Sequence, residues 1–359
     1  MSTSRVGMQG RLWAGKFAAK AARHLARSML FTAAVTIHVS ASAAQPETIG
    51  RIERFDPAVN ALVPADAKIE KLAAGFTWAE GPAWIRSGSY LLFTDVPENT
   101  LYRWSEQQGL SVFMKPSGYA GPKLEGLREA GANGLFAEPG GAVLLADSGS
   151  RVVSRLSLAD KKKAVLASSY QGKRFNSPND LVPRSDGSIF FTDPPYGLAG
   201  LNDSKLKELT FNGVFRIAPD GRVTLIDDQI TFPNGIALSP DEKTLYVSSS
   251  DRKKFLWMAY TLDAAGNVVS RRVFADASDL VAEDKPGSAD GMAIAADGHI
   301  FATAPGGVLI MTPDGRRLGR IETGTAIANC AFGDDGRTLY MTSKNMLARV
   351  RLSTLGLGF

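Results

Sequence analysis

One unit of sequence recurs six times between Glu80 and Ser343, and this repetition constrains the fold more than any other feature. Each unit starts with an acidic or amide residue and an apolar run, passes a turn, and ends in a second apolar run with a small or polar residue. The two landmarks lie 14 or 15 positions apart in every unit. The starting residues, called the ring residues below, are Glu80, Asn133, Asn179, Asn234, Asp290 and Asn329.

Turn signals separate the two apolar runs of each unit. Examples are Asp186-Gly187, Asp297-Gly298 and Asp335-Gly336. Units of about 40–55 residues built from short strands and turns are typical of β-propellers. We therefore predict an all-β fold, a six-bladed β-propeller. The sixth unit is one strand short after Leu352, so we expect the N-terminal segment at residues 68–72 to pair with the C-terminal blade and close the ring. An open sandwich would not explain the constant spacing.

Residues 1–44 differ in composition from the remainder and are typical of a signal peptide. They hold six basic residues and no acidic one, then an apolar run over residues 29–39 and small residues of the A-x-A type. We predict a propeller domain at 45–359 that is exported to the periplasm or the exterior. A membrane anchor is the alternative, but the apolar run is short for a membrane span and contains His38.

The charge of the whole chain is set by this leader. The chain has 41 basic and 36 acidic residues, a net charge of +5. Without the leader's six basic residues, 35 basic stand against 36 acidic, a net charge of −1. The mature domain therefore has no basic excess, and we predict that it binds neither nucleic acid nor membranes.

The ring residues are predicted to gather at one mouth of the central channel, because the first strand of each blade lines that channel. Asp95, Asp147 and Asp193 end second strands and should lie on the same face. Carboxylate and amide oxygens suit Ca²⁺ or Mg²⁺ and would accept Mn²⁺ or Zn²⁺. The alternative is that Asn-Gly and Asp-Gly only cap strands. It is weakest for Glu80 and Asp290, because a carboxylate facing a narrow channel is costly to bury without a cation.

Histidine and cysteine chemistry is limited by their number. Outside the leader the chain has one histidine, His299, and one cysteine, Cys330. His299 follows a turn that is expected on the face opposite the ring, so neither a Ser-His-Asp triad nor a multi-histidine zinc centre can form. Cys330 lies in an apolar strand and is expected to be inert. Acid–base chemistry must therefore come from carboxylates, with the help of a metal.

Short motifs in the repeats carry a family resemblance. They are Glu80-Gly-Pro-Ala-Trp84, Asn176-Ser-Pro-Asn-Asp-Leu181, Phe191-Thr-Asp-Pro-Pro-Tyr-Gly197, Phe232-Pro-Asn-Gly-Ile236, Ala289-Asp-Gly-Met292, Ala304-Pro-Gly-Gly307 and Asn329-Cys-Ala-Phe332. They occur in order and in register. On these motifs the chain resembles the gluconolactonase, regucalcin and luciferin-regenerating family of six-bladed propellers, and within it the exported bacterial gluconolactonases.

The resemblance implies roles for single residues. Glu80, Asn234 and Asp290 would hold the metal, and Asn179 would touch the substrate and also reach the metal. Asp290 would be the proton acceptor. These positions coincide with ring residues that the repeat predicts on its own. A sugar-binding arginine of regucalcin-like members has no equivalent here, and Arg174 would replace it only if its loop folds back.

The function predicted from these observations is metal-dependent hydrolysis of D-glucono-1,5-lactone, or a close aldonolactone, to the aldonic acid. Asp290 would be the general base, and Ca²⁺ is favoured over Mg²⁺, Mn²⁺ or Zn²⁺. Asn179, Asn133 and Arg174 are the candidates for substrate binding. Loops at residues 194–196 and 202–212 are expected to cover the metal face. Two alternatives stay open: a broader lactonase or phosphotriesterase that uses the same site, and a non-catalytic propeller that binds a sugar or a partner.

Overall fold

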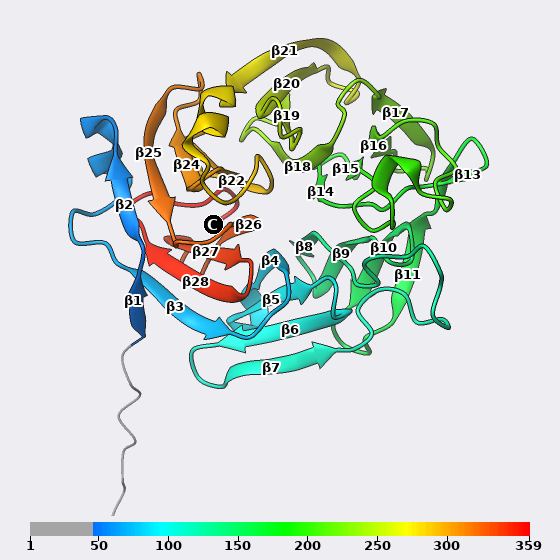
Figure 1. Cartoon of the computed structure of the whole chain (residues 1–359), viewed down its shortest axis with the longest axis horizontal. Helices are drawn as coiled ribbons and strands as arrows, with labels where there is room; N and C mark the ends of the chain where they lie inside the picture. Colours follow the sequence, from blue (N-terminus) through cyan, green and yellow to red (C-terminus); the bar gives the residue numbers. More distant parts are fainter. Residues whose placement is uncertain (1–45) are drawn as a thin grey trace, which may run out of the picture. The chain divides into compact units, whose positions relative to one another are not determined.

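The computed structural model describes residues 46–359, whose regular structure is almost entirely β-strand. Six antiparallel sheets follow one another around a central axis as the blades of a propeller (Figure 1). The predicted six-bladed β-propeller is confirmed. The predicted leader, residues 1–44, lies outside the described residues.

The first four blades each consist of four strands in chain order. Blade one contains β4 (Ala79–Ile85), β5 (Tyr90–Asp95), β6 (Thr100–Ser105) and β7 (Gly109–Met114). Blade two contains β8 (Leu135–Glu138), β9 (Ala142–Asp147), β10 (Val152–Ser157) and β11 (Lys163–Ala167). Blade three contains β14 (Leu181–Pro183), β15 (Ile189–Asp193), β16 (Gly213–Ile217) and β17 (Val223–Asp227). Blade four contains β18 (Pro233–Leu238), β19 (Thr244–Ser249), β20 (Leu256–Leu262) and β21 (Val268–Asp276).

The last two blades each take strands from the N-terminal part of the domain. Blade five contains β22 (Met292–Ile294), β23 (Ile300–Ala304), β24 (Gly307–Met311) and β25 (Arg317–Glu322), with β2 (Arg51–Arg54) at its outer edge. Blade six contains β26 (Asn329–Gly333), β27 (Thr338–Ser343) and β28 (Met346–Arg351), followed by β3 (Ile69–Ala74) and β1 (Glu47–Ile49). Because β3 pairs antiparallel with β28, strands from the two ends of the domain meet in one sheet. β3 includes most of the segment predicted to close the ring.

Short elements connect the blades. A small hairpin of β12 (Ser169–Tyr170) and β13 (Lys173–Arg174) precedes blade three. Four 3-10 helices complete the regular structure of the described part: η1 (Pro57–Ala61), η2 (Arg86–Gly88), η3 (Leu201–Asp203) and η4 (Ser278–Glu283). Within residues 46–359, no helix is both long enough and apolar enough to span a membrane.

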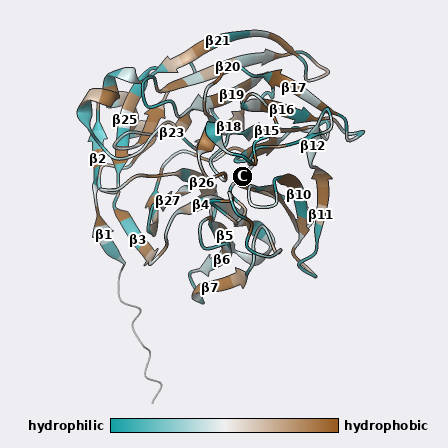
Figure 2. Cartoon of the chain, turned by 45° about the vertical axis from the view of Figure 1, so that its right-hand side comes forward, coloured by the Kyte–Doolittle hydropathy of each residue, from teal (hydrophilic) through white to brown (hydrophobic). Residues whose placement is uncertain are grey.

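The hydrophobic core lies between neighbouring blades rather than at one centre. Leu92 of blade one and Leu145 of blade two, for example, are fully buried in the same cluster. Each inner strand is covered on both faces by adjacent blades, which explains continuous apolar runs instead of alternation. Figure 2 shows hydrophobic segments along the strands of the blades.

Neighbouring blades touch closely at the ring residues. Gly81 has a φ of +51°, and a Cβ on it would lie 2.2 Å from the carbonyl oxygen of Asn133 in the next blade. A Cβ on Gly235 would lie 2.2 Å from the carbonyl oxygen of Asp290. The Thr94 hydroxyl donates to the same carbonyl of Asn133 at 3.0 Å. Glycine after the ring residue therefore permits the close blade contact that brings ring residues together at one mouth.

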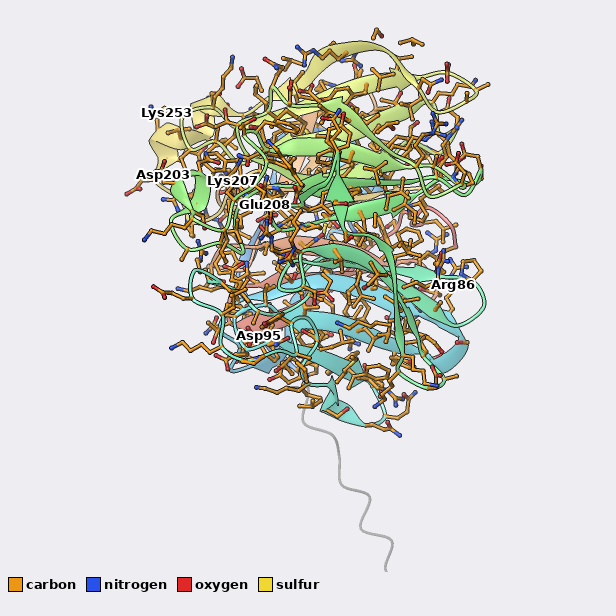
Figure 3. The ribbon with its side chains drawn as sticks, turned by 90° about the vertical axis from the view of Figure 1, so that its right-hand side faces the viewer. Arg86, Asp95, Asp203, Lys207, Glu208 and Lys253 are labelled. Atoms are coloured by element: carbon orange, nitrogen blue, oxygen red, sulfur yellow. The ribbon has the colours of Figure 1, made fainter. Side chains whose placement is uncertain are left out.

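The channel has two different mouths, which the edge-on view separates. Asp95 and Lys207 lie on one side of the propeller and Arg86, which follows β4, lies on the other (Figure 3). We call the first side the ring face, because the ring residues stand at the starts of the inner strands there, and the second the opposite face.

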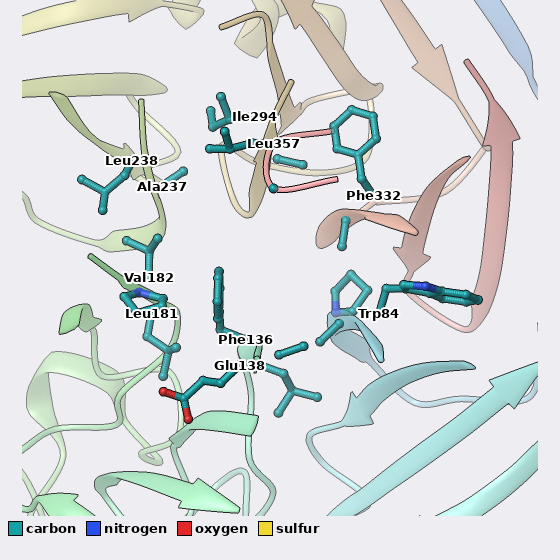
Figure 4. A pocket seen from close by; sticks show the side chains of 18 of the residues that line it. Trp84, Phe136, Glu138, Leu181, Val182, Ala237, Leu238, Ile294, Phe332 and Leu357 are labelled. Carbon is teal, nitrogen blue, oxygen red and sulfur yellow. The ribbon is translucent and has the colours of Figure 1, made fainter. Parts of the chain in front are cut away.

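Toward the opposite face the channel widens into a cavity of about 840 Å³. Its walls are mostly apolar, with Trp84, Phe136 and Phe332 among the lining residues (Figure 4). The C-terminal Leu357 also lines it and donates its backbone N–H to the carbonyl of Ile294 at 2.9 Å.

Candidate active site

All six ring residues are buried, with exposed fractions between 3% and 8%. Glu80 and Asn234 are the second residues of β4 and β18, and both strands shift register at this point. Asn133, Asn179 and Asp290 stand just before β8, β14 and β22. A register shift beside a site turns a side chain out of the regular alternation, so it can aim Glu80 and Asn234 at the mouth of the channel.

Two of the three aspartates that end second strands, Asp95 and Asp193, hold the chain that leads to a ring residue. The Asp95 carboxylate accepts the backbone N–H groups of Thr77 and Trp78 at 2.9 and 3.0 Å. This fixes the two residues that enter β4 ahead of Glu80. The prediction placed Asp95 on the ring face, but its contacts show a structural role that the spacing alone did not reveal.

Asp193 has the same arrangement in blade three. Its carboxylate accepts the backbone N–H groups of Asn176 and Ser177 at 2.7 and 2.8 Å, just before Asn179. Asp95 and Asp193 therefore position the segment that precedes a ring residue, whereas Asp147 accepts the backbone N–H of Ser150 at 3.0 Å and the Lys163 ammonium at 2.7 Å.

Glu80 is held by two local donors. The indole Nε1 of Trp78 donates to one carboxylate oxygen at 3.3 Å, and the backbone N–H of Gly81 donates to the other at 3.2 Å. The Trp78 ring is half-buried, so it borders the site while its nitrogen orients Glu80. Sequence reasoning did not single out Trp78.

Asn234 contributes an oxygen atom without a partner. Its Nδ2 donates to the hydroxyl of Ser250 at 2.7 Å, and its side chain lies close to Asp290. Within residues 46–359 its Oδ1 is buried and has no hydrogen-bond partner. A buried, unpaired carbonyl oxygen costs free energy, and a bound cation would remove that cost.

The buried carboxylates of the site repel one another. Burial, followed by the charges of Glu80 and Asp180, raises the pKa of Asp290 well above its ordinary value. Burial and the Asp180 charge raise the pKa of Glu80 to about 8. Ionisation of these two carboxylates is therefore unfavourable in the protein alone, which favours the binding of a cation.

Asp180 is a buried acid that the sequence prediction missed. It occupies the position that is glycine after four of the six ring residues, and this departure from the repeat was the available signal. Its carboxylate accepts the backbone N–H groups of Leu181 and Ile236, at 2.9 and 3.4 Å, and lies close to the Asn329 side chain. Burial raises the pKa of Asp180 to about 7. Asp180 also lines the cavity of the opposite face.

Two loops meet above the ring face. The backbone N–H groups of Arg128 and Glu129 donate to the carbonyl of Gly197 at 2.8 and 3.2 Å. The Glu129 side chain is largely buried, and its charge contributes to the raised pKa of Glu80. The segment between blades one and two thus reaches the site, which its sequence did not indicate.

Tyr196 lies beside the proposed base. Its ring stacks on Phe232 with centroids 5.9 Å apart, and its hydroxyl lies near Ser250 and Asp290. This is the loop expected from the sequence to cover the metal face.

The remaining predicted substrate residues differ in their placement. In the described part of the chain, the side-chain amides of Asn133 and Asn179 form no hydrogen bond with protein groups. Arg174 is exposed in β13; its guanidinium donates to the Ser150 carbonyl at 3.1 Å and its backbone N–H to Glu208 at 2.8 Å. Neither contact of Arg174 brings it to a ring residue.

The donors at this mouth fit a hard divalent cation. Two carboxylates, Glu80 and Asp290, and the unpaired Oδ1 of Asn234 are oxygen ligands of the kind that Ca²⁺ prefers. Residues 46–359 contain no group of three or more His, Cys, Asp or Glu side chains arranged to hold a metal. A cation here would therefore depend on amide oxygens as well as carboxylates.

The metal-free protein is expected to lose stability as the pH rises from about 5 to about 8.5. The pKa of Glu80 is raised from 4.5 to about 8, so the folded protein holds its proton more tightly than the unfolded chain does. The stabilisation is complete at pH values below the pKa of Glu80 in the unfolded chain, and it is lost as the pH rises through the pKa of Glu80 in the folded protein. The raised pKa of Asp180 acts in the same direction. Melting temperatures measured in the presence of a chelator should fall as the pH is raised across this range. A steady rise in melting temperature would contradict the raised pKa values of Glu80 and Asp180.

A sequence model of the SMP-30/Gluconolactonase/LRE-like region matches residues 78–345, which is most of the chain. The chain belongs to this family. The match extends from Trp78, two residues before Glu80, to Asn345, which lies between β27 and β28, so it includes all six ring residues.

Other members of the family agree with this assignment. A gluconolactonase of Zymomonas mobilis is 43% identical over 333 residues, covering 90% of this chain and 94% of the relative. The structure of a gluconolactonase from Xanthomonas campestris is 28% identical, with a TM-score of 0.73 over 87% of this chain and 99% of that one. A calcium-binding regucalcin from Agrobacterium tumefaciens shares the fold, at 19% identity and a TM-score of 0.61 over 80% of this chain and 94% of that one. The family member described here is a hydrolase of the gluconolactonase type.

Proposed function

We propose that the protein is a metal-dependent sugar lactonase that hydrolyses D-glucono-1,5-lactone, or a close aldonolactone, to the aldonic acid. The observation that carries the proposal is the gathering of Glu80, Asn234 and Asp290 at the ring face, with Asn234 Oδ1 buried and unpaired. Similarity to a gluconolactonase over nearly the whole chain supports the choice of substrate. We also propose that the domain is exported, on the basis of the sequence of residues 1–44.

The proposed metal ligands are Glu80, Asn234 and Asp290, with Asn179 beside them. Ca²⁺ is the favoured ion, because all the donors are hard oxygen atoms and a relative with the same fold is described as calcium-binding. When bound, a divalent cation supplies Lewis-acid polarisation of the lactone carbonyl.

Asp290 is the proposed general base. Its carboxylate takes a proton from the attacking water while the water oxygen bonds to the carbonyl carbon. When the ring C–O bond breaks, the same proton passes from Asp290 to the departing oxygen, which becomes a hydroxyl group. Lactone and water are thus converted to the aldonic acid without any other reactant.

The substrate is held by amides and aromatic groups. Asn179 and Asn133 have side-chain amides free to pair with sugar hydroxyls, and Trp78 and Tyr196 border the mouth. We assign the sugar contacts to the two asparagines in preference to Arg174. The exposed Arg174 guanidinium is already hydrogen-bonded to the Ser150 carbonyl.

The experiment that tests this function is gluconolactone hydrolysis in a pH-indicator assay, with the spontaneous rate subtracted. The protein is treated with EDTA, and Ca²⁺, Mg²⁺, Mn²⁺ or Zn²⁺ is then added back separately. We expect turnover to fall to the spontaneous rate and to return, with Ca²⁺ the most effective ion. Full turnover after complete metal removal would contradict metal dependence. No turnover with any ion, on protein with a normal circular dichroism spectrum, would contradict the substrate.

A further inference from the structure

Ser250 stands at the centre of the contacts that hold two proposed ligands. It follows β19, and its side chain is buried. Its hydroxyl donates to the carbonyl of Ala289, the residue before Asp290, and accepts the Nδ2 group of Asn234 at 2.7 Å. The side chain of Tyr196 lies close to the same hydroxyl.

The direction of these hydrogen bonds follows from chemistry. A serine hydroxyl has a single proton, and the Ala289 carbonyl can only accept, so the Ser250 proton must point to Ala289. Ser250 therefore has no proton to offer Asn234 and can only accept from it. The atom of Asn234 that faces Ser250 must be the nitrogen, because an amide oxygen there would face another acceptor.

This arrangement decides which atom of Asn234 is available to a cation. With Nδ2 turned to Ser250, Oδ1 is left buried and unpaired at the site. The opposite orientation would present N–H donors to the site, and a nitrogen with two protons cannot coordinate a cation. The hydrogen bond to Ser250 therefore fixes this orientation of the Asn234 amide.

Ser250 also acts on the backbone at Asp290, together with Ser248. The Ser248 hydroxyl donates to the carbonyl of Asp290 at 2.9 Å, and Ser250 donates to the preceding carbonyl. Ser248 and Ser250 are two positions apart, as expected for side chains on the same side of an extended chain. Ser249 lies between them, and within residues 46–359 its side chain forms no hydrogen bond, so it provides a matched control.

We infer that Ser250 is a positioning residue that orients the Asn234 amide oxygen toward a divalent cation and fixes the backbone ahead of Asp290. This inference rests on the proposed function, because it concerns the cation site of that reaction. A hydroxyl acceptor is what the position requires, so threonine can replace serine and alanine cannot.

Calcium binding measured by titration calorimetry tests the inference without reference to activity. Ser250→Ala is expected to weaken Ca²⁺ affinity about 10–100-fold, the usual cost of removing a residue that orients a ligand. Ser249→Ala should change affinity by less than about threefold, and Ser250→Thr should recover most of the loss. If Ser250→Ala does not fold, Ser250→Cys keeps the size and weakens only the acceptor, and it should also lower affinity.

A double-mutant cycle separates orientation from general packing. Asn234→Asp places two equivalent oxygens at the position, so no orientation has to be chosen. In that background Ser250→Ala should reduce affinity by less than about threefold. Equal losses in both backgrounds would overturn the orienting role, and so would unchanged affinity in the single variant. No Ca²⁺ binding by the unaltered protein would instead overturn the cation site of the proposed function, and the role of Ser250 with it.

Discussion

Replacing Asp290 with alanine is expected to lower the turnover number for gluconolactone by well over ~10²-fold, because this change removes both a metal ligand and the general base. Asp290 is 8% exposed, and its carboxylate lies beside that of Glu80 among buried groups. Among residues 46–359, no histidine is placed to take over, since His299 pairs with Asp297 in the turn before β23 on the opposite face.

The Asp290→Ala result is measured as initial rates at saturating gluconolactone and saturating Ca²⁺. Asp290→Asn is the informative companion, because it keeps an oxygen ligand of the same shape but cannot accept the proton. We expect the Asp290→Asn variant to bind Ca²⁺ more tightly than the Asp290→Ala variant does. Both variants should be equally inactive. Near-normal turnover in either variant would remove Asp290 from the role of base.

Replacing Glu80 with glutamine is expected to weaken Ca²⁺ binding by about 10²-fold, since a site with two carboxylates loses half of its negative charge. The same change should leave the metal-free protein as stable as before, or more stable, near pH 8. Burial raises the pKa of Glu80 to about 8, so its ionised form is unfavourable in the fold and a neutral group of equal size removes that cost.

Two measurements on the Glu80→Gln protein test this expectation: Ca²⁺ titration, and thermal unfolding in the presence of a chelator. Glu138→Gln provides the control, because Glu138 lines the cavity of the opposite face and pairs with Arg155. Weaker calcium binding without loss of metal-free stability would support the ligand role. Unchanged calcium affinity would exclude Glu80 from the site, and a large fall in metal-free stability would show a mainly structural role.

The spacing of landmarks was enough to predict the fold, because a propeller repeats its strand pairs at nearly constant length. Glu80, Asn179 and Asp290 could be placed at one mouth for the same reason, since the start of each inner strand lies at the same end of the channel. That they hold a metal and act on a lactone stays a proposal.

Contacts between blades could not be predicted from the spacing. The roles of Asp95 and Ser250 depend on backbone groups in other segments, and a single sequence does not show which carbonyl a hydroxyl will meet. Asp180 was missed because an Asn-Asp pair is common in turns. The available signal was that Asp180 stands where four other units have glycine. Whether Arg174 could reach the substrate depended on how its loop folds, and no pattern in the sequence specifies the conformation of that loop.

The sheet shared by the two ends of the domain has a consequence for the order of folding. The Glu70 carboxylate of β3 contacts the Arg349 guanidinium of β28 at 2.7 Å, across 279 positions of the chain. Loop-closure entropy opposes contacts of such long range until the intervening chain is ordered. The first strands to be synthesised therefore wait for the last. A nascent chain that has not yet reached β28 leaves β3 without this partner, and a chain truncated at its N-terminal end, without β3, leaves the edge of β28 open.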